Sequence, residues 1–207
     1  MQASASASSA TPASASSVAA AGGAVKLVIA PDANSEIDIR MRELLAGNVA
    51  QNDAIESTKT VSGAINLDAS GGVLPGSKIN LDLRTLKSDR SQRDNFIKGR
   101  FVLNTAQFPL VEFAPTEVQG LDGTPPTSGQ KTFKLLGEAT VRGVTRPLTW
   151  DVTATFDQQG CQGQATTAFK LSDFGMTPPK AGPVVQVEDA GMLTMRFQAS
   201  AMRTATS

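Results

Sequence analysis

The sequence predicts an all-β protein, an extended antiparallel β-barrel of about eight strands with one short helix. From residue 25 onward, apolar and polar residues alternate strictly over many short segments, which places every second side chain on one face of a strand. Glycine and proline separate these segments. A sheet of such strands must hide its apolar face. Because one short helix cannot cover that face, the sheet has to close on itself or form two layers.

Nine segments are candidate strands. The clearest is 148–157, where Leu148, Trp150 and Val152 alternate with threonine and aspartate. A strand with one apolar and one polar face is typical of an antiparallel sheet whose outer face is wet. In chain order, the candidates are residues 25–29, 36–42, 61–67, 78–84, 111–113, 133–141, 148–157, 165–171 and 193–199.

The connections between these segments carry turn chemistry. Residues 71–76 contain Gly-Gly and Pro-Gly pairs, and residues 158–160 are expected to close a hairpin. Residues 88–100 are polar and densely charged, which predicts a short helix capped by Ser88 or Asp89. Prolines at 178, 179 and 183 predict an unpaired connection after residue 171, with the final strand beginning only beyond residue 189.

Composition excludes several classes of site. The 207 residues correspond to one domain, because domains commonly contain about 100–200 residues. Lys and Arg (19) balance Asp and Glu (19), so no net field attracts nucleic acid or acidic membranes. His is absent and Cys161 is the single cysteine, which excludes His-based triads, His-containing metal sites and paired-cysteine sites. We therefore predict no metal and no nucleic-acid partner.

Residues 1–24 differ from the rest of the chain. They contain ten Ala and seven Ser, so they bury too little apolar surface to offset the entropy of ordering. We predict a disordered tether over 1–24 and a barrel domain over 25–203. The tether lacks the basic and apolar regions of a signal peptide. Two interpretations stay open, an exported protein whose signal has been removed and a cytosolic protein with a disordered start.

The interior of the barrel is the candidate functional region. An eight-stranded barrel has room for side chains alone or for one small ligand, and periodicity does not distinguish the two. On pattern alone, inward apolar residues are more often core than channel. The strand acids Asp82, Glu112, Glu138 and Asp151 fall on the polar side of the alternation, away from any desolvated substrate. We therefore predict that the protein is not an enzyme.

Three ordered motifs carry a family resemblance. Residues 93–98 read RDNFIK and are followed by Phe101 and by QFPLVEF at 107–113. Residues 137–148 read GEATVRGVTRPL, and residues 170–176 read KLSDFGM. These motifs resemble the signatures of the YceI-like family, bacterial polyisoprenoid-binding proteins with a lipocalin-like barrel.

The resemblance implies non-catalytic binding, storage or transport of an isoprenoid lipid in an apolar barrel lumen. The ligand would be a polyprenyl chain or an isoprenoid quinone, and no catalytic cofactor is implied. The resemblance also implies a periplasmic or otherwise exported protein, secreted or held as a lipoprotein by its tether. A membrane or a protein would act as transient donor or acceptor of the lipid, and the protein would be a monomer or a homodimer.

Candidate lumen residues are the inward apolar positions of the strands and of the motifs. They are Ile37, Ile39, Met41, Ile65, Leu67, Ile79, Leu81, Leu83, Phe96, Phe101, Phe108, Phe113, Leu135, Leu148, Trp150, Val152, Phe169, Phe174, Met176, Leu193, Met195 and Phe197. Arg93 and Asp94 are candidates for a polar mouth, with a helix-surface or helix-to-barrel salt bridge as the alternative.

The stretch 47–60 is longer than the family norm, and two further departures from the family pattern concern histidine. Family members often carry His where this chain has Phe96, and a His-Ser pair where it has Asn34-Ser35. We therefore expect a more apolar head-group end. Two other functions stay open, which are sequestration of other hydrophobic small molecules and a filled-core barrel that acts through its surface. Cys161 is expected to be a spectator.

Overall fold

The computed structural model describes residues 23–31, 34–47, 50–121, 123–180 and 184–204, so most of the predicted tether lies outside the described residues. Ten strands form one antiparallel sheet, accompanied by one helix and two 3₁₀ turns. The strands are β1 (Val25–Ile29), β2 (Glu36–Leu45), β3 (Asn52–Thr58), β4 (Val61–Leu67), β5 (Lys78–Asp82), β6 (Leu110–Gln119), β7 (Gly129–Val141), β8 (Val144–Phe156), β9 (Gly160–Lys170) and β10 (Val184–Arg203). The 3₁₀ turns are η1 (Leu83–Thr85) and η2 (Ser172–Phe174), and the helix is α1 (Ser91–Lys98).

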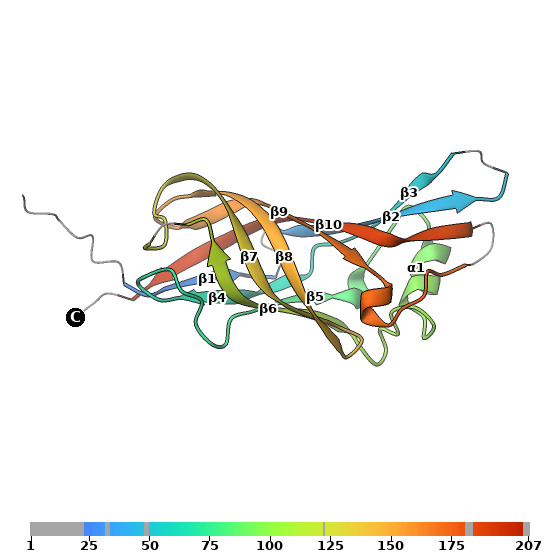
Figure 1. Ribbon diagram of the computed structural model, residues 1–207, viewed down its shortest axis with the longest axis horizontal. Helices are drawn as coiled ribbons and strands as arrows, with labels where there is room; N and C mark the ends of the chain where they lie inside the picture. Colours follow the sequence, from blue (N-terminus) through green and yellow to red (C-terminus); the bar gives the residue numbers. More distant parts are fainter. Residues whose placement is uncertain (1–22, 32–33, 48–49, 122, 181–183, 205–207) are drawn as a thin grey trace, which may run out of the picture.

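Eight of the strands close into a barrel, which confirms the predicted fold. The sheet runs in the order β1-β4-β5-β6-β7-β8-β9-β10-β2-β3, and β1 pairs with β10 as well as with β4. The β1–β10 pairing closes the ring, while β2 and β3 continue the sheet on the other part of β10 (Figure 1). In the described part of the chain, no helix is long and apolar enough to cross a membrane.

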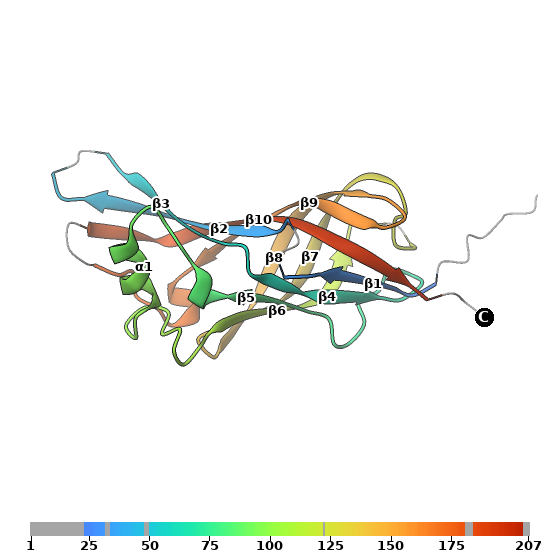
Figure 2. The same cartoon turned by 180° about the vertical axis from the view of Figure 1, so that it is seen from behind.

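One edge of strand β10 changes its pairing partner along the length of the barrel. One edge of β10 pairs with β9 from Ala190 to Ser200. The other edge pairs with β2 from Val184 to Arg196 and then with β1 from Ser200 to Arg203. The wall is therefore completed by β1 and β4 at the end where the described chain terminates, and by β2 and β3 at the end that carries α1 (Figure 2).

The predicted start of the last strand is wrong. Residues 187–189 belong to β10, which begins at Val184 and runs for 20 residues. Two irregularities interrupt its pairing with β2, one between Val184 and Gln186 and one between Val187 and Gly191. These bulges break the strict alternation, so the first half of β10 does not show the pattern of a strand.

The sequence analysis missed β3. Of the inward positions on this strand, Ala54 is apolar but Glu56 and Thr58 are polar, so the segment lacks the apolar rhythm of its neighbours. Its backbone pairs with β2 and also exchanges two hydrogen bonds with Lys87. The Ser57 amide donates to the Lys87 carbonyl at 2.8 Å, and the Lys87 amide donates to the Ser57 carbonyl at 2.9 Å. This pairing connects β3 to the segment that leads into α1.

Helix α1 is present as predicted, but its predicted cap is wrong. The helix begins at Ser91, and the N-cap residue Arg90 makes no side-chain capping bond. Asp94 reaches back instead: its Oδ1 accepts the Ser88 amide at 2.9 Å and the Ser88 hydroxyl at 2.6 Å. A carboxylate from the first turn of the helix thus fixes the chain that precedes it. The helix lies across the β2–β3 end of the barrel (Figures 1 and 2).

Candidate ligand-binding lumen

The barrel encloses a cavity of about 560 Å³. Sites for small molecules commonly have volumes of about 300–1,000 Å³. All ten strands and α1 contribute side chains to the lining, so the cavity is the lumen of the barrel and not a surface groove. The sequence did not distinguish a filled barrel from a hollow one, and the structure shows that the interior is partly hollow.

Nearly all predicted lumen residues line this cavity. They lie on strands that are far apart in the sequence and converge on the interior because alternate positions of each strand point inward. The exceptions are Phe101 and Phe108, which are absent from the lining. That the lining residues contact a ligand remains a prediction.

Phe101 and Phe108 lie outside the lumen because they belong to the loop between α1 and β6, where strand alternation does not apply. Phe101 is 78% exposed, and its ring lies 4.4 Å from the guanidinium carbon of Arg100. Phe108 is half-buried and lies against the β7–β8 hairpin at Gly143. Both residues follow α1 and precede β6, in a segment held by backbone turn bonds.

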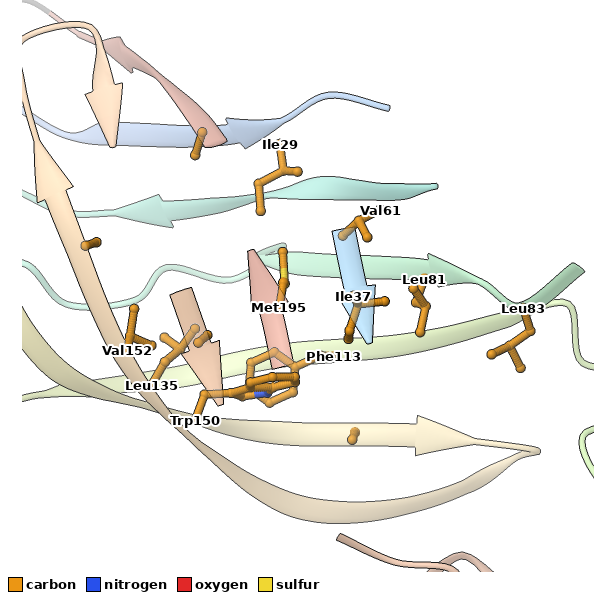
Figure 3. Close-up of a cluster of buried hydrophobic side chains, with 14 of the residues drawn as sticks. Ile29, Ile37, Val61, Leu81, Leu83, Phe113, Leu135, Trp150, Val152 and Met195 are labelled. Atoms are coloured by element: carbon orange, nitrogen blue, oxygen red, sulfur yellow. The ribbon is translucent and has the colours of Figure 1, made fainter. Parts of the chain in front are cut away.

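The interior contains a cluster of large apolar side chains around Trp150. Figure 3 shows Trp150 of β8, Phe113 of β6, Met195 of β10 and Ile37 of β2 pointing into the same region. The rings of Phe113 and Trp150 meet edge to face, with centroids 6.2 Å apart. The indole Nε1 of Trp150 is buried and has no hydrogen-bond partner. The single tryptophan of the chain is therefore a natural fluorescence reporter for the lumen.

The charged and amide side chains of the lumen lie toward its ends. Five of its six charged or amide side chains come from β2, β3, α1 and the residue before α1, and the sixth is Arg203 at the opposite end. They are Glu43, Glu56, Arg90, Gln92, Arg93 and Arg203. Phe96 shares α1 with Arg93 and lines the same cavity, so polar side chains accompany it at this end. That this end is more apolar than in family members with histidine remains a prediction.

Arg93 forms the helix-to-barrel salt bridge that the sequence analysis held as the alternative. Its Nη2 lies 2.9 Å from Oε1 of Glu43, and its Nη1 lies 2.6 Å from Oδ1 of Asp89. The side chain of Glu43 is 5% exposed and that of Arg93 is 14% exposed, so this pair is largely withdrawn from water. Asp94 does not line the cavity, and its carboxylate is bound to Ser88.

Glu56 is the unpaired acid of the lumen. The residue is 5% exposed, and neither carboxyl oxygen has a hydrogen-bond partner. Burial raises the pKa of Glu56 to about 7 because it removes the water that stabilises the anion, and the nearby Asp94 carboxylate raises it further. Ser88, Arg93 and Lys98 act in the opposite direction. The shortest hydrogen bond of the Ser88 hydroxyl is the one to Asp94 at 2.6 Å.

The sequence analysis missed both inward acids. Glu43 has the same parity as Ile37, Ile39 and Met41 on β2, so alternation alone could have placed it inside. Glu56 alternates with Ile55 and has the parity of Ala54, but no apolar rhythm marked its strand.

The remaining reactive side chain of the lumen is Cys161, the second residue of β9. It is 8% exposed, and burial raises the pKa of its thiol to about 11, with Asp157 adding to the shift. A thiol that stays protonated is a poor nucleophile. Within the described ranges, no three His, Cys, Asp or Glu side chains group to hold a metal ion.

A YceI-like domain matches residues 28–199. A UPF0312 protein of Pseudomonas putida (strain GB-1) is 34% identical over 115 residues, which are 51% of this chain and 55% of that protein. A UPF0312 protein of Pseudomonas savastanoi pv. phaseolicola is 32% identical over 123 residues, or 55% of this chain and 58% of that protein. The matched region thus spans just over half the length of these curated relatives.

Solved structures share the fold at low sequence identity. A polyisoprenoid-binding domain from Saccharophagus degradans has a TM-score of 0.59 at 9% identity, covering 86% of this chain and 98% of that one. BcnA of Burkholderia cenocepacia has a TM-score of 0.57 at 12% identity, covering 81% and 96%. The YceI protein of Campylobacter jejuni has a TM-score of 0.55 at 18% identity, covering 76% and 87%. With a hollow apolar barrel and a domain match over most of its length, the chain belongs to the YceI-like family.

Proposed function

We propose that the protein binds one isoprenoid lipid, a polyprenyl chain or an isoprenoid quinone, in the barrel lumen and stores or carries it unchanged. The observation that carries this proposal is the cavity of about 560 Å³, lined almost entirely by apolar side chains from every strand. The similarity to a polyisoprenoid-binding domain of Saccharophagus degradans supports the same class of ligand. Family membership favours a binding protein over an enzyme.

The energetics favour a carrier or a store. Burial of a CH₂ group contributes about 0.8 kcal/mol, so a chain of about 40 carbons leaving water would gain about 30 kcal/mol. This gain exceeds the practical limit of non-covalent binding free energy, which is about 20 kcal/mol. Such a lipid does not start in water but in a bilayer, which is already apolar. Transfer into the lumen is then nearly neutral, and the lipid exchanges with a membrane or with a protein donor.

We place this function in the periplasm, as an extension of the same proposal. The family resemblance and the Ala- and Ser-rich composition of residues 1–24 support export. Fractionation of the native host, with detection of this chain in the periplasmic fraction, tests the location. Recovery in the cytosol alone would contradict it.

The lipid carried by the native protein tests the function. Mass spectrometry of an organic extract of the purified protein is expected to show a polyprenyl lipid or an isoprenoid quinone at about one molecule per chain. Fatty acids or other hydrophobic compounds at that stoichiometry would favour sequestration of another ligand class. Protein that contains no lipid, and takes up none from vesicles doped with polyprenol or quinone, would favour the filled-core, surface-acting alternative.

A further inference from the structure

The end of the lumen next to α1 contains an unsatisfied hydrogen-bonding group. Glu56 lines the cavity, is 5% exposed, and has no partner for either carboxyl oxygen. Buried polar groups in native proteins are almost always hydrogen-bonded. The carboxyl group of Glu56 is therefore available to hydrogen-bond with a molecule in the lumen.

The charges around Glu56 define what that partner can be. From α1, Arg93 is committed to Glu43 of β2 and to Asp89, while Asp94 is bound to Ser88. Lys98 exerts the smallest of the effects on Glu56. Arg90, the other cation that lines this end, lies 3.6 Å from the carboxylate of Asp89. An anionic head group would therefore have to compete with Glu43 or Asp89 for the cations that line this end.

We propose that Glu56 is the head-group contact of the lumen, donating a hydrogen bond as a neutral carboxylic acid to the carbonyl oxygen of an uncharged isoprenoid ligand. A ketone or a quinone fits this site, whereas the same chain with a phosphate or diphosphate head does not. This inference rests on the proposed isoprenoid function and names the head group that the lumen selects.

The inference sets the direction of a pH effect. Burial raises the pKa of Glu56 to about 7. A carbonyl that accepts the Glu56 proton stabilises the neutral form, so binding raises the pKa and takes up a proton. Affinity is therefore highest below pH about 7 and falls as the pH rises from the pKa of the empty protein toward that of the complex. The charged groups around Glu56 are Asp94, Arg93 and Lys98 of α1, together with Glu43 of β2 and Arg90, which line the same end of the lumen.

Three probes separate the head group from the chain. Delipidated protein is titrated with geranylgeranylacetone, which has a ketone head, with geranylgeranyl diphosphate, which has an anionic head, and with squalene, which has no polar head. Fluorescence of Trp150, the single tryptophan, reports occupancy of the lumen. At pH about 6 the ketone is expected to bind about tenfold or more tightly than the diphosphate, and its affinity should fall about three- to tenfold by pH about 8.5.

Two substitutions at Glu56 isolate its role. Glu56→Gln keeps an uncharged donor of similar shape, so it should still prefer the ketone but lose the pH dependence. Glu56→Leu should bind the ketone about three- to tenfold more weakly and squalene no more weakly than the unmodified protein does. Glu138→Gln, at an exposed glutamate of β7, is the matched control and should behave as the unmodified protein.

The outcomes distinguish this inference from the proposed function. Saturable binding of squalene, with equal affinities for ketone and diphosphate and no pH effect, would overturn the role of Glu56 and leave isoprenoid binding intact. Failure of all three probes to change the Trp150 emission or to co-elute with the protein would overturn the proposed function itself. Tighter binding of the diphosphate would also contradict the inference, because the site would then receive an anion.

Discussion

The Val152→Trp variant is expected to purify folded but with much less lipid in its lumen. Val152 is 3% exposed and lines the cavity from β8, with Phe133 and Ala165 beside it on the neighbouring strands. An indole at this position projects into open volume and occupies space that the ligand needs. Mass spectrometry of the organic extract should show lipid reduced about tenfold or more, while urea denaturation should show a change of less than about 1 kcal/mol.

The control for this experiment is on the same strand. Thr155→Trp adds the same ring on the exposed face of β8, so it should leave the bound lipid unchanged. If the interior were close-packed, the Val152 variant would instead lose about 1–3 kcal/mol of stability. Lost stability with full lipid content would therefore contradict the hollow lumen.

Removal of Arg93 is expected to have the largest effect on stability. The Arg93→Ala variant leaves the carboxylate of Glu43, whose side chain is 5% exposed, buried without its counter-charge. Breaking a buried ion pair in this way costs about 3–5 kcal/mol, because an uncompensated charge remains. Chemical denaturation of the variant, followed by far-UV circular dichroism, measures the loss.

Two further variants interpret that loss. The double variant Glu43→Leu/Arg93→Met removes both charges and keeps similar volume, so it should recover most of the stability. Arg40→Ala breaks an exposed pair between Arg40 of β2 and Asp53 of β3, whose closest atoms are 3.6 Å apart. This change should cost less than about 1 kcal/mol of stability. If Arg40→Ala and Arg93→Ala lost equal stability, burial would not be the cause of the large contribution expected from the Arg93–Glu43 pair.

Alternation predicted the barrel well where a strand has one solvent-exposed face and one buried face. Residues 25–29 and 61–67 coincide with β1 and β4, and the lumen residues predicted on the strands line the cavity. The pattern failed where polar residues point inward, as in β3, and where bulges shift the parity, as in β10. Both failures have one cause. Alternation shows which residues are apolar, but it does not show which way each side chain points.

The polar end of the lumen was beyond the reach of local sequence. Glu43 and Arg93 are separated by 50 residues, and they meet only because α1 lies across the end formed by β2 and β3. Glu56 likewise lies beside Ser57, which pairs with Lys87 across 30 residues of sequence. Parity can place an acid on the inner face, but whether water reaches it depends on which element covers that end.

The strand order also determines how the chain can fold. From β4 to β10, every strand pairs with its neighbour in sequence, so this meander can form from short-range contacts. The β1–β10 seam joins Val25 to Arg203 through four residue pairs and closes nearly the whole chain into a loop. Closing so long a loop carries an entropic penalty that few contacts offset. We expect the seam to form after the rate-limiting step, so weakening it should accelerate unfolding while the refolding rate in stopped-flow experiments stays nearly constant.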